Sequence, residues 1–319
     1  MSNEKKFIVS HAPFWHDGSS ISERSYHTML AAMPAVLFGL IQYGIPALAV
    51  ISLSISTAII WELIINKITK LPNTIGDGNA ALMGLVFGMM MPATLPWWIV
   101  ATGTFIAVVI GKYIFGGIGS NAFHPVVVSI TILLISWNSY FDFDNALVNY
   151  DFGFPAVFPL GALKAFGTGS IHGFSLSGLL MGQQVGAIGS TFGLGLIIGG
   201  IYLILRGFIR WEISISFLAG MFLAAMIFNM ANPEKFAGPF FHILTGYSLI
   251  GAFFLATEDS SSPVNCIPML IYGAGAGILT VLIRNIGAYV DGVLYAILIM
   301  NLVNPLLDKI RPKAIGKVA

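Results

Sequence analysis

The sequence of 319 residues is 56% hydrophobic and only 9% charged, and its mean hydropathy is +0.86. Soluble domains carry about 25% charged residues, so this composition excludes an ordinary soluble protein and indicates a polytopic membrane protein. The single cysteine, Cys266, excludes an internal disulfide and any metal or iron–sulfur site built only from cysteines of this chain.

Residues 1–28 form a polar N-terminal arm that includes Lys5, Lys6, Glu23 and Arg24. The arm lacks the apolar core that is typical of a signal peptide. We therefore expect it to stay on the side of the membrane where the chain is made.

Ten apolar segments follow the arm, separated by polar connections that contain Gly, Pro and Asp. They span residues 29–41, 47–65, 80–92, 97–114, 122–137, 189–205, 213–229, 239–256, 268–283 and 293–307. The only long connection is 138–188. Gly195 and Gly199, like Gly273 and Gly277, have the four-residue spacing that favours close approach of two membrane helices.

The third segment is too short to cross a bilayer as a helix. It has about a dozen apolar residues between Asn79 and Pro92, whereas a membrane-spanning helix needs about 20. Unpaired backbone is costly in lipid, so a short helix flanked by Gly and Pro must lie inside protein or line a cavity. Discontinuous helices of this kind form binding sites in many transport proteins, and the alternative is a kinked helix packed on its neighbours. The eighth segment also looks interrupted.

Lysine and arginine are unevenly divided between the two sides of the membrane. If the segments alternate in direction, one side receives the arm, the even-numbered connections and the tail, with 12 of the 15 Lys and Arg residues. The other side receives Lys164, Lys235 and Arg284. Positive residues favour the cytoplasm, so we expect cytoplasmic N- and C-termini and a connection 138–188 that faces outside.

The two halves of the chain carry similar patterns. Gly84 lies twelve residues before Pro96, and Gly251 lies twelve residues before Pro263. Five segments per half is an odd number, so the repeats are expected to be inverted, as in several carriers and channels. We therefore predict an all-α protein with about ten transmembrane helices in two inverted five-helix repeats with interrupted helices. The expected parts are the arm 1–28, the first repeat 29–137, the loop 138–188, the second repeat 189–307 and the tail 308–319.

Ionisable and amide groups inside or beside membrane segments are candidates for an ion path, because they are costly there. The candidates are Asp77, Lys112, Asn121, Glu258, Asp259 and Asp291. The alternative is structural: Lys112 caps a helix end and pairs with Glu258 or Asp259. His124 and His242 each open a segment and are expected to be structural. We identify no catalytic residue, no metal site and no nucleic-acid motif.

Four stretches resemble the D subunit of Rnf-type ion-translocating ferredoxin:NAD oxidoreductases, which is related to the B subunit of the sodium-pumping NADH:quinone reductase. They read SHAPFWHDGSSISERSYHTML, GDGNAALMGLVFGMMMPATLPWW, GKYIFGGIGSNAFHPVVV and PLGALK. The resemblance implies a ten-helix fold of two inverted repeats in a bacterial inner membrane. It also implies partner subunits, both membrane-embedded and peripheral, and coupling of electron flow to Na⁺ or H⁺ movement.

The resemblance further implies FMN attached through its phosphate to a threonine in the outside-facing loop, and here the sequence departs from the family. Counting forward from Asp151 puts Val157 at the attachment position, and counting back from Pro159 puts Phe158 there. Neither has a hydroxyl, so covalent FMN is not expected, and the flavin is either non-covalent or absent. Thr168 is the nearest hydroxyl downstream. Four phenylalanines of the loop suit stacking on a flavin, but packing of the loop onto the membrane surface is favoured; they are Phe152, Phe154, Phe158 and Phe166.

The expected function is that of a membrane subunit of an Rnf-like redox-driven ion pump, inactive without its partners. One alternative is a stand-alone inverted-repeat channel or carrier for a small solute. Another is a flavin-less structural subunit of the same complex.

Overall fold

The structure is a computed structural model that describes residues 20–311, apart from residues 73, 148–149 and 151. Throughout this range the chain is helical or irregular and contains no strand. Asp151, one of the expected flavin-loop residues, lies outside the described residues.

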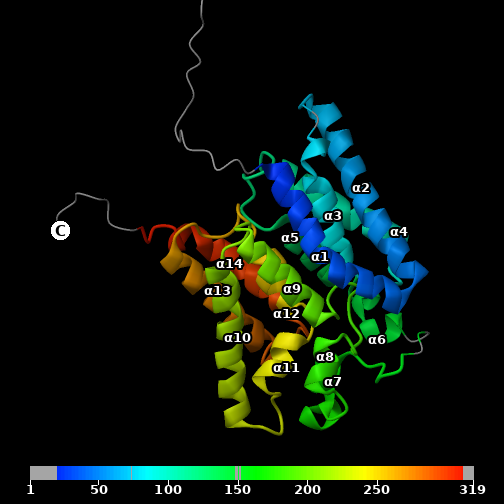
Figure 1. The fold of residues 1–319 in the computed structure, drawn as a ribbon, viewed down its shortest axis with the longest axis vertical. Helices are drawn as coiled ribbons and strands as arrows, with labels where there is room; N and C mark the ends of the chain where they lie inside the picture. Colours follow the sequence, from blue (N-terminus) through cyan, green and yellow to red (C-terminus); the bar gives the residue numbers. More distant parts are fainter. Residues whose placement is uncertain (1–19, 73, 148–149, 151, 312–319) are drawn as a thin grey trace, which may run out of the picture.

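Each of the ten apolar segments overlaps one helix or a run of two or three consecutive helices (Figure 1). In the first half they are α1 (Ile21–Tyr43), α2 (Ile45–Thr69), α3 (Asn79–Met89), α4 (Trp97–Phe105) continued by the π-helix η2 (Ile106–Tyr113), and α5 (Pro125–Ser136). In the second half they are α9 (Gly193–Leu205), α10 (Trp211–Ala231), α11 (Pro239–Leu244) followed by α12 (Ser248–Ile250) and the π-helix η5 (Gly251–Leu255), α13 (Cys266–Asn285) and α14 (Val293–Leu307).

Short helices occupy the connections. They are η1 (Ile75–Asp77), η3 (Asn138–Phe141), α6 (Phe143–Ala146), α7 (Pro159–Phe166), η4 (Thr168–Ile171) and α8 (Leu176–Leu180). All but η1 belong to the long connection 138–188, which lies at the end of the molecule away from the tip of α2 (Figure 1).

Among the residues that the structure describes, three helices are long and apolar enough to cross a membrane by themselves. They are α2, α10 and α13, with 25, 21 and 20 residues and mean hydropathies of 2.2, 2.0 and 2.0. Large apolar side chains such as Ile41 and Ile45 are more than 80% exposed, as expected for a surface that faces lipid. The chain is an all-α polytopic membrane protein.

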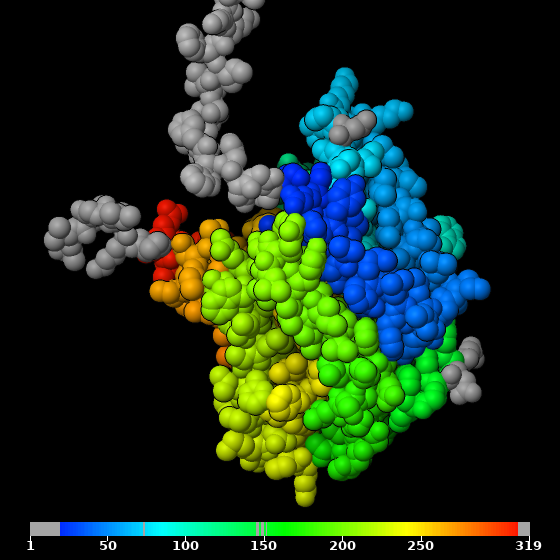
Figure 2. Space-filling view, viewed as in Figure 1, coloured from blue at the N-terminus to red at the C-terminus, as the bar shows by residue number. Residues whose placement is uncertain are grey.

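Close helix packing occurs where the small-residue spacing predicted it. A Cβ atom added to Gly277 of α13 would lie 2.1 Å from the carbonyl oxygen of Phe217 in α10. A Cβ atom on Gly199 of α9 would lie 2.1 Å from the carbonyl oxygen of Ala31 in α1. The first and second halves therefore meet along α1 and α9, which lie side by side (Figure 2).

The short helix α3 is buried in protein, which confirms the prediction from its length. Its last residue, Met89, and the two residues that follow, Met90 and Met91, are at most 1% exposed. The Met89 carbonyl accepts a hydrogen bond of 2.7 Å from the Gly189 N–H, and the Met90 carbonyl accepts one of 2.9 Å from the Tyr247 hydroxyl. These contacts satisfy the carbonyls at the end of the helix, which lipid would leave unpaired.

The eighth segment is interrupted between α11 and α12, at Thr245–Tyr247, as its sequence suggested. Gly246 there has a φ of +65°, a conformation that glycine adopts without strain. The interruption leaves helix-end carbonyls and N–H groups exposed inside the protein, where polar side chains must satisfy them.

Candidate functional site

A cavity of about 320 Å³ lies between helices of the two halves. Its size is within the range of about 300–1,000 Å³ that is typical of small-molecule sites. The first half lines it with residues of α1, α3 and the start of α5, and the second half with η5 and the loop that follows. The polar residues of the lining are Arg24, Ser25, Thr28, Asn79, His124, Thr257, Glu258, Asp259 and Ser260.

Glu258 is held in this cavity by neutral donors from both halves. Its Oε1 accepts a hydrogen bond of 3.2 Å from Asn121 Nδ2 and another from the Ser260 hydroxyl. Its Oε2 accepts bonds of 3.0 and 2.6 Å from the N–H and the hydroxyl of Ser261. The Asn121 amide also accepts a bond of 2.9 Å from the Ser260 hydroxyl. Asn121 and Glu258, predicted from separate halves, are thus in direct contact.

Asp259 forms an ion pair with Arg24 of α1. His124 caps α5 by accepting a bond of 3.4 Å from the Val127 N–H through Nδ1, which is the structural role expected of it. The cavity therefore has two carboxylates, Glu258 and Asp259, against one guanidinium. The Arg24 guanidinium interacts electrostatically with Glu258 as well as with Asp259, so one cation faces two carboxylates and this wall of the cavity keeps an excess of negative charge that favours a cation. Hydroxyl, amide and carboxylate oxygens are the ligands that hard cations prefer.

Lys112 pairs with Glu62 of α2, so the predicted pairing with Glu258 or Asp259 is wrong. Lys112 Nζ lies 3.0 Å from Glu62 Oε1, and the two side chains are 3% and 0% exposed. The same Oε1 accepts a bond of 3.0 Å from the Tyr113 hydroxyl. Within the described part of the chain, Glu62 Oε2 is buried without a hydrogen-bond partner.

Glu62 is the ionisable residue that sequence reasoning missed. A signal was present, because Glu62 is an acidic residue inside the apolar segment 47–65, where a charge is costly. Its partner lies 50 positions further along the chain, so local spacing gave no indication of the pair.

Asp77 is the last residue of η1 and lies two residues before the short helix α3. Its Oδ1 accepts a hydrogen bond of 2.8 Å from the Asn79 N–H, which satisfies one of the free N–H groups at the start of the helix. Partial burial raises the pKa of the Asp77 carboxyl above its usual range, and the Asn79 bond and the charge of Lys112 oppose that shift. Asp77 does not line the cavity, although the neighbouring Asn79 does.

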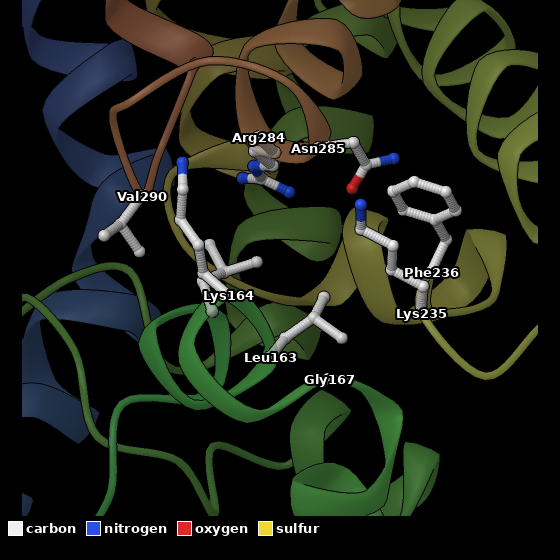
Figure 3. A pocket seen from close by; sticks show the side chains of 9 residues that line it. Leu163, Lys164, Gly167, Lys235, Phe236, Arg284, Asn285 and Val290 are labelled. Atoms are coloured by element: carbon white, nitrogen blue, oxygen red, sulfur yellow. The ribbon is translucent and has the colours of Figure 1, made fainter.

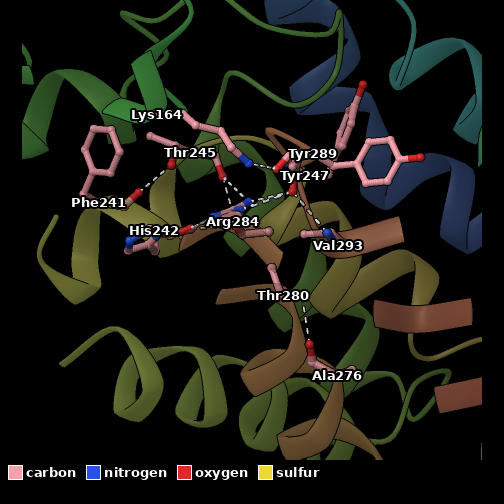
Figure 4. Close-up of polar contacts among 12 residues, drawn as sticks. Lys164, Phe241, His242, Thr245, Tyr247, Ala276, Thr280, Arg284, Tyr289 and Val293 are labelled. Atoms are coloured by element: carbon pink, nitrogen blue, oxygen red, sulfur yellow. Dashed lines mark hydrogen bonds and ion pairs between the residues drawn. The ribbon is translucent and has the colours of Figure 1, made fainter. Parts of the chain in front are cut away.

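Arg284 and Asp291 form a second buried ion pair, with Arg284 Nη2 2.9 Å from Asp291 Oδ1. Figure 4 shows the Arg284 guanidinium beside His242 and Thr245. The guanidinium also donates to the carbonyl oxygens of His242 at 2.7 Å and Thr245 at 3.2 Å. Asp291 Oδ2 accepts a bond of 2.7 Å from the Tyr247 N–H. The pair thus satisfies both backbone ends of the interruption between α11 and α12, a structural task far from the cavity around Glu258.

The loop residues do not fit covalent FMN at the expected position. Phe158 is buried against Phe143, with ring centroids 5.0 Å apart, and its N–H donates to Asp144 Oδ1 at 2.6 Å. Val157 is exposed but has no hydroxyl. The Thr168 hydroxyl donates to the carbonyl oxygen of Glu234 at 2.5 Å, so it fastens the loop to the connection after α10.

Three aromatic residues of the loop pack on one another, whereas the loop residue Phe166 is 79% exposed. The rings of Phe152 and Phe154 are stacked with centroids 5.0 Å apart, and Tyr150 stacks on Phe152 at 5.6 Å. Tyr43 of α1 contacts Phe152 edge-on at 5.9 Å. These contacts join the loop to the end of α1.

Among the described residues, no group of three or more His, Cys, Asp or Glu side chains is placed to hold a metal ion.

Comparisons with known proteins agree with the sequence motifs. The profile of the NQR2, RnfD, RnfE family matches residues 8–316. The D subunit of a proton-translocating ferredoxin:NAD(+) oxidoreductase complex from Clostridium ljungdahlii is 36% identical over 312 residues, which cover 95% of this chain and 94% of that protein. The D subunit of a Na(+)-translocating ferredoxin:NAD(+) oxidoreductase complex from Acetobacterium woodii is 32% identical and covers 96% and 94%.

The D subunit of an ion-translocating oxidoreductase complex from Cronobacter sakazakii is 31% identical over 97% of this chain and 99% of its own length. The likeness therefore extends from the polar arm to the end of the second half, well beyond the four motifs. The chain belongs to the NQR2, RnfD, RnfE family.

Proposed function

We propose that this chain is a membrane subunit of an Rnf-like electron-transport complex that couples redox chemistry between ferredoxin and NAD to the translocation of Na⁺ or H⁺. The observation that carries the proposal is the end-to-end similarity to D subunits of such complexes, including 36% identity over 95% of the chain. Those relatives are named as subunits, so the chain is proposed to act with membrane and peripheral partners and to be inactive alone.

The proposed architecture is ten membrane crossings in two inverted repeats, 29–137 and 189–307, with the arm 1–28 and the tail 308–319 in the cytoplasm and the loop 138–188 outside. It is supported by the overlap of each of the ten apolar segments with one helix or a run of two or three consecutive helices. The uneven division of Lys and Arg supports the orientation.

We propose that the cavity around Glu258 is part of the ion path, with Asn121 and Asp259 as further members. Its position between the two halves and its excess of carboxylates over cations support this role. Of the other ion-path candidates, Lys112 and Asp291 are engaged in buried ion pairs and Asp77 caps a helix, so these three are proposed to position the path rather than carry the ion.

Replacing Glu258 by Gln in the assembled complex tests this role. Gln removes the charge and keeps the shape of the side chain. We therefore expect ion uptake into proteoliposomes to fall at least about tenfold, which corresponds to the free energy of one interaction with a charged group. Ferredoxin-dependent NAD⁺ reduction should continue under uncoupled conditions. The matched control is Glu234→Gln, the same change at an exposed residue. Unchanged ion uptake in Glu258→Gln would remove Glu258 from the path.

We propose that any flavin of this subunit is bound without a covalent bond. The absence of a hydroxyl at Val157 and Phe158, and the engagement of Thr168 with Glu234, support this. Acid precipitation of the purified subunit separates the cases. Flavin fluorescence in the protein band of a denaturing gel would contradict the proposal, whereas FMN in the supernatant would support it.

A second candidate is a flavin-less structural subunit of the same complex, which the missing threonine specifically favours. Absence of flavin from both fractions would support this candidate. A stand-alone channel is supported less, because a channel needs a continuous path. The cavity around Glu258 and a second hollow, which Arg284 at the end of α13 helps to line (Figure 3), share no lining residue. Solute flux through liposomes that contain the lone subunit would nevertheless establish that alternative.

A further inference from the structure

The end of α2 carries an open hollow of about 460 Å³. Its lining comes from the last turns of the helix and from the two residues that follow it. The six lining residues are Leu63, Ile64, Asn66, Lys67, Lys70 and Leu71. This end of α2 projects beyond the other labelled helices (Figure 1), and the hollow shares no lining residue with the cavity around Glu258.

The hollow is shaped by the way in which α2 ends. The N–H groups of Lys70 and Leu71 both donate to the carbonyl oxygen of Asn66, the latter at 3.0 Å, so the chain curls back over the last turn. Lys70 has a φ of +56°, and glycine is the usual residue at such a position because it has no Cβ atom. Among the described residues, Lys70 is the only residue other than glycine with a positive φ. A lysine that is kept in this conformation indicates a task for its side chain.

Asn66 connects the hollow to the interior of the protein. Its side chain is almost fully buried. Its Nδ2 donates to the Thr74 hydroxyl at 3.1 Å, and its Oδ1 accepts a hydrogen bond of 2.7 Å from the Tyr113 hydroxyl. The helix end that presents the two lysines is therefore held in place by buried contacts.

The lining combines uncompensated positive charge with exposed apolar surface. Lys67 and Lys70 are exposed, and within the described residues neither forms an ion pair. None of the six lining residues is acidic. The apolar side chains of Leu63 and Leu71 are 40% and 50% exposed. A ligand that complements this lining is anionic at one end and apolar at the other.

The depth of the hollow in the membrane agrees with such a ligand. Trp61 lies six residues before Lys67, which is about 9 Å along the helix. Tryptophan favours the boundary between the hydrocarbon and the headgroups, so the two lysines beyond it are expected at the level of the lipid headgroups.

We propose that the end of α2 binds one anionic phospholipid, with its phosphate at Lys67 and Lys70 and an acyl chain along Leu63 and Ile64. Ammonium groups form strong hydrogen bonds with phosphate oxygens, and lysines beside the membrane attract anionic lipids. A soluble phosphate complements the hollow less well, because it leaves the apolar side chains in water.

The test uses the full chain in nanodiscs of phosphatidylcholine with a minor fraction of phosphatidylglycerol, and native mass spectrometry identifies the lipids that the released chain retains. Lys70→Gly removes the ammonium group and places glycine at the positive φ, so the helix end should form at least as well as before. Lys67→Arg keeps the charge. Lys309→Gln is the control, because it removes an exposed positive charge outside the hollow.

We expect selective retention of one phosphatidylglycerol, about fivefold weaker in Lys70→Gly and unchanged in Lys67→Arg and Lys309→Gln. The melting midpoint of Lys70→Gly should stay the same or rise, so unfolding would not explain the loss of lipid. No transport is measured, so the result is independent of the proposed role in ion translocation.

Three results would each overturn the proposal. The first is retention of phosphatidylcholine as strong as that of phosphatidylglycerol. The second is a loss of lipid in Lys309→Gln as large as in Lys70→Gly, which would show that only the overall charge matters. The third is displacement of phosphatidylglycerol by an excess of soluble glycerol phosphate, which would show that the apolar part of the lining plays no part in binding.

Discussion

Replacing either Lys112 or Glu62 alone is expected to destabilise the fold strongly. Replacing both together is expected to lower the free energy of unfolding little further than replacing one of them. The side chains are 3% and 0% exposed, so water cannot compensate a charge that loses its partner. Removing one partner of a buried pair costs about 3 to 5 kcal/mol. At about 2 to 4 °C per kcal/mol, each single variant, Lys112→Met or Glu62→Gln, should lower the melting midpoint by about 6 to 20 °C.

The double variant Lys112→Met/Glu62→Gln leaves no buried charge at this place, so its midpoint should lie near that of one single variant or above it. The resulting coupling free energy should be at least about 2 kcal/mol. Thermal unfolding of the detergent-purified chain, followed by tryptophan fluorescence, measures all three. Lys67→Met, at an exposed lysine of the same helix as Glu62, is the control. If the losses of the two single variants simply add in the double variant, the charges do not stabilise each other and the reasoning is refuted.

Two further variants test the packing and the interruption of the second half. Gly277→Ala places a methyl group 2.1 Å from the Phe217 carbonyl, so we expect a loss of about 1 to 3 kcal/mol in unfolding experiments, whereas Gly238→Ala, with open space around it, should change little. Arg284→Met leaves Asp291 buried and unpaired, and we expect a loss of about 3 to 5 kcal/mol by the same measurement. A stable Arg284→Met variant would show that other groups satisfy the interruption.

Much of the fold could be predicted from the sequence, because membrane helices are specified by local composition. The apolar segments located the helices, the shortness of the run after Asn79 identified a buried half-helix, and the spacing of Gly273 and Gly277 identified a close contact. Each of these signals resides within one stretch of chain and depends on a simple physical limit: the thickness of the bilayer, or the room that a side chain needs.

The site could be predicted only in part, because it depends on which distant residues meet. The candidates Asn121 and Glu258, which come from different halves of the chain, are in contact, and their role in an ion path stays a prediction. The partner of Lys112 was predicted wrongly, since Glu62 lies on another helix. The convergence of Lys164 and Lys235 on one hollow (Figure 3) also could not be foreseen, because three-dimensional proximity between different segments leaves no periodic signal in a single sequence.

In the π-helix η2, the direction of the Lys112 side chain depends on the number of residues that precede it, and not only on their identity. Each residue of an α-helix turns the chain by about 100°, and the wider turn of Ile106–Tyr113 changes the direction in which Lys112 projects. Deleting one residue before Lys112 would turn its side chain away from Glu62, even with every remaining residue unchanged. Among relatives of this chain, a one-residue gap in this helix would therefore matter more than several substitutions.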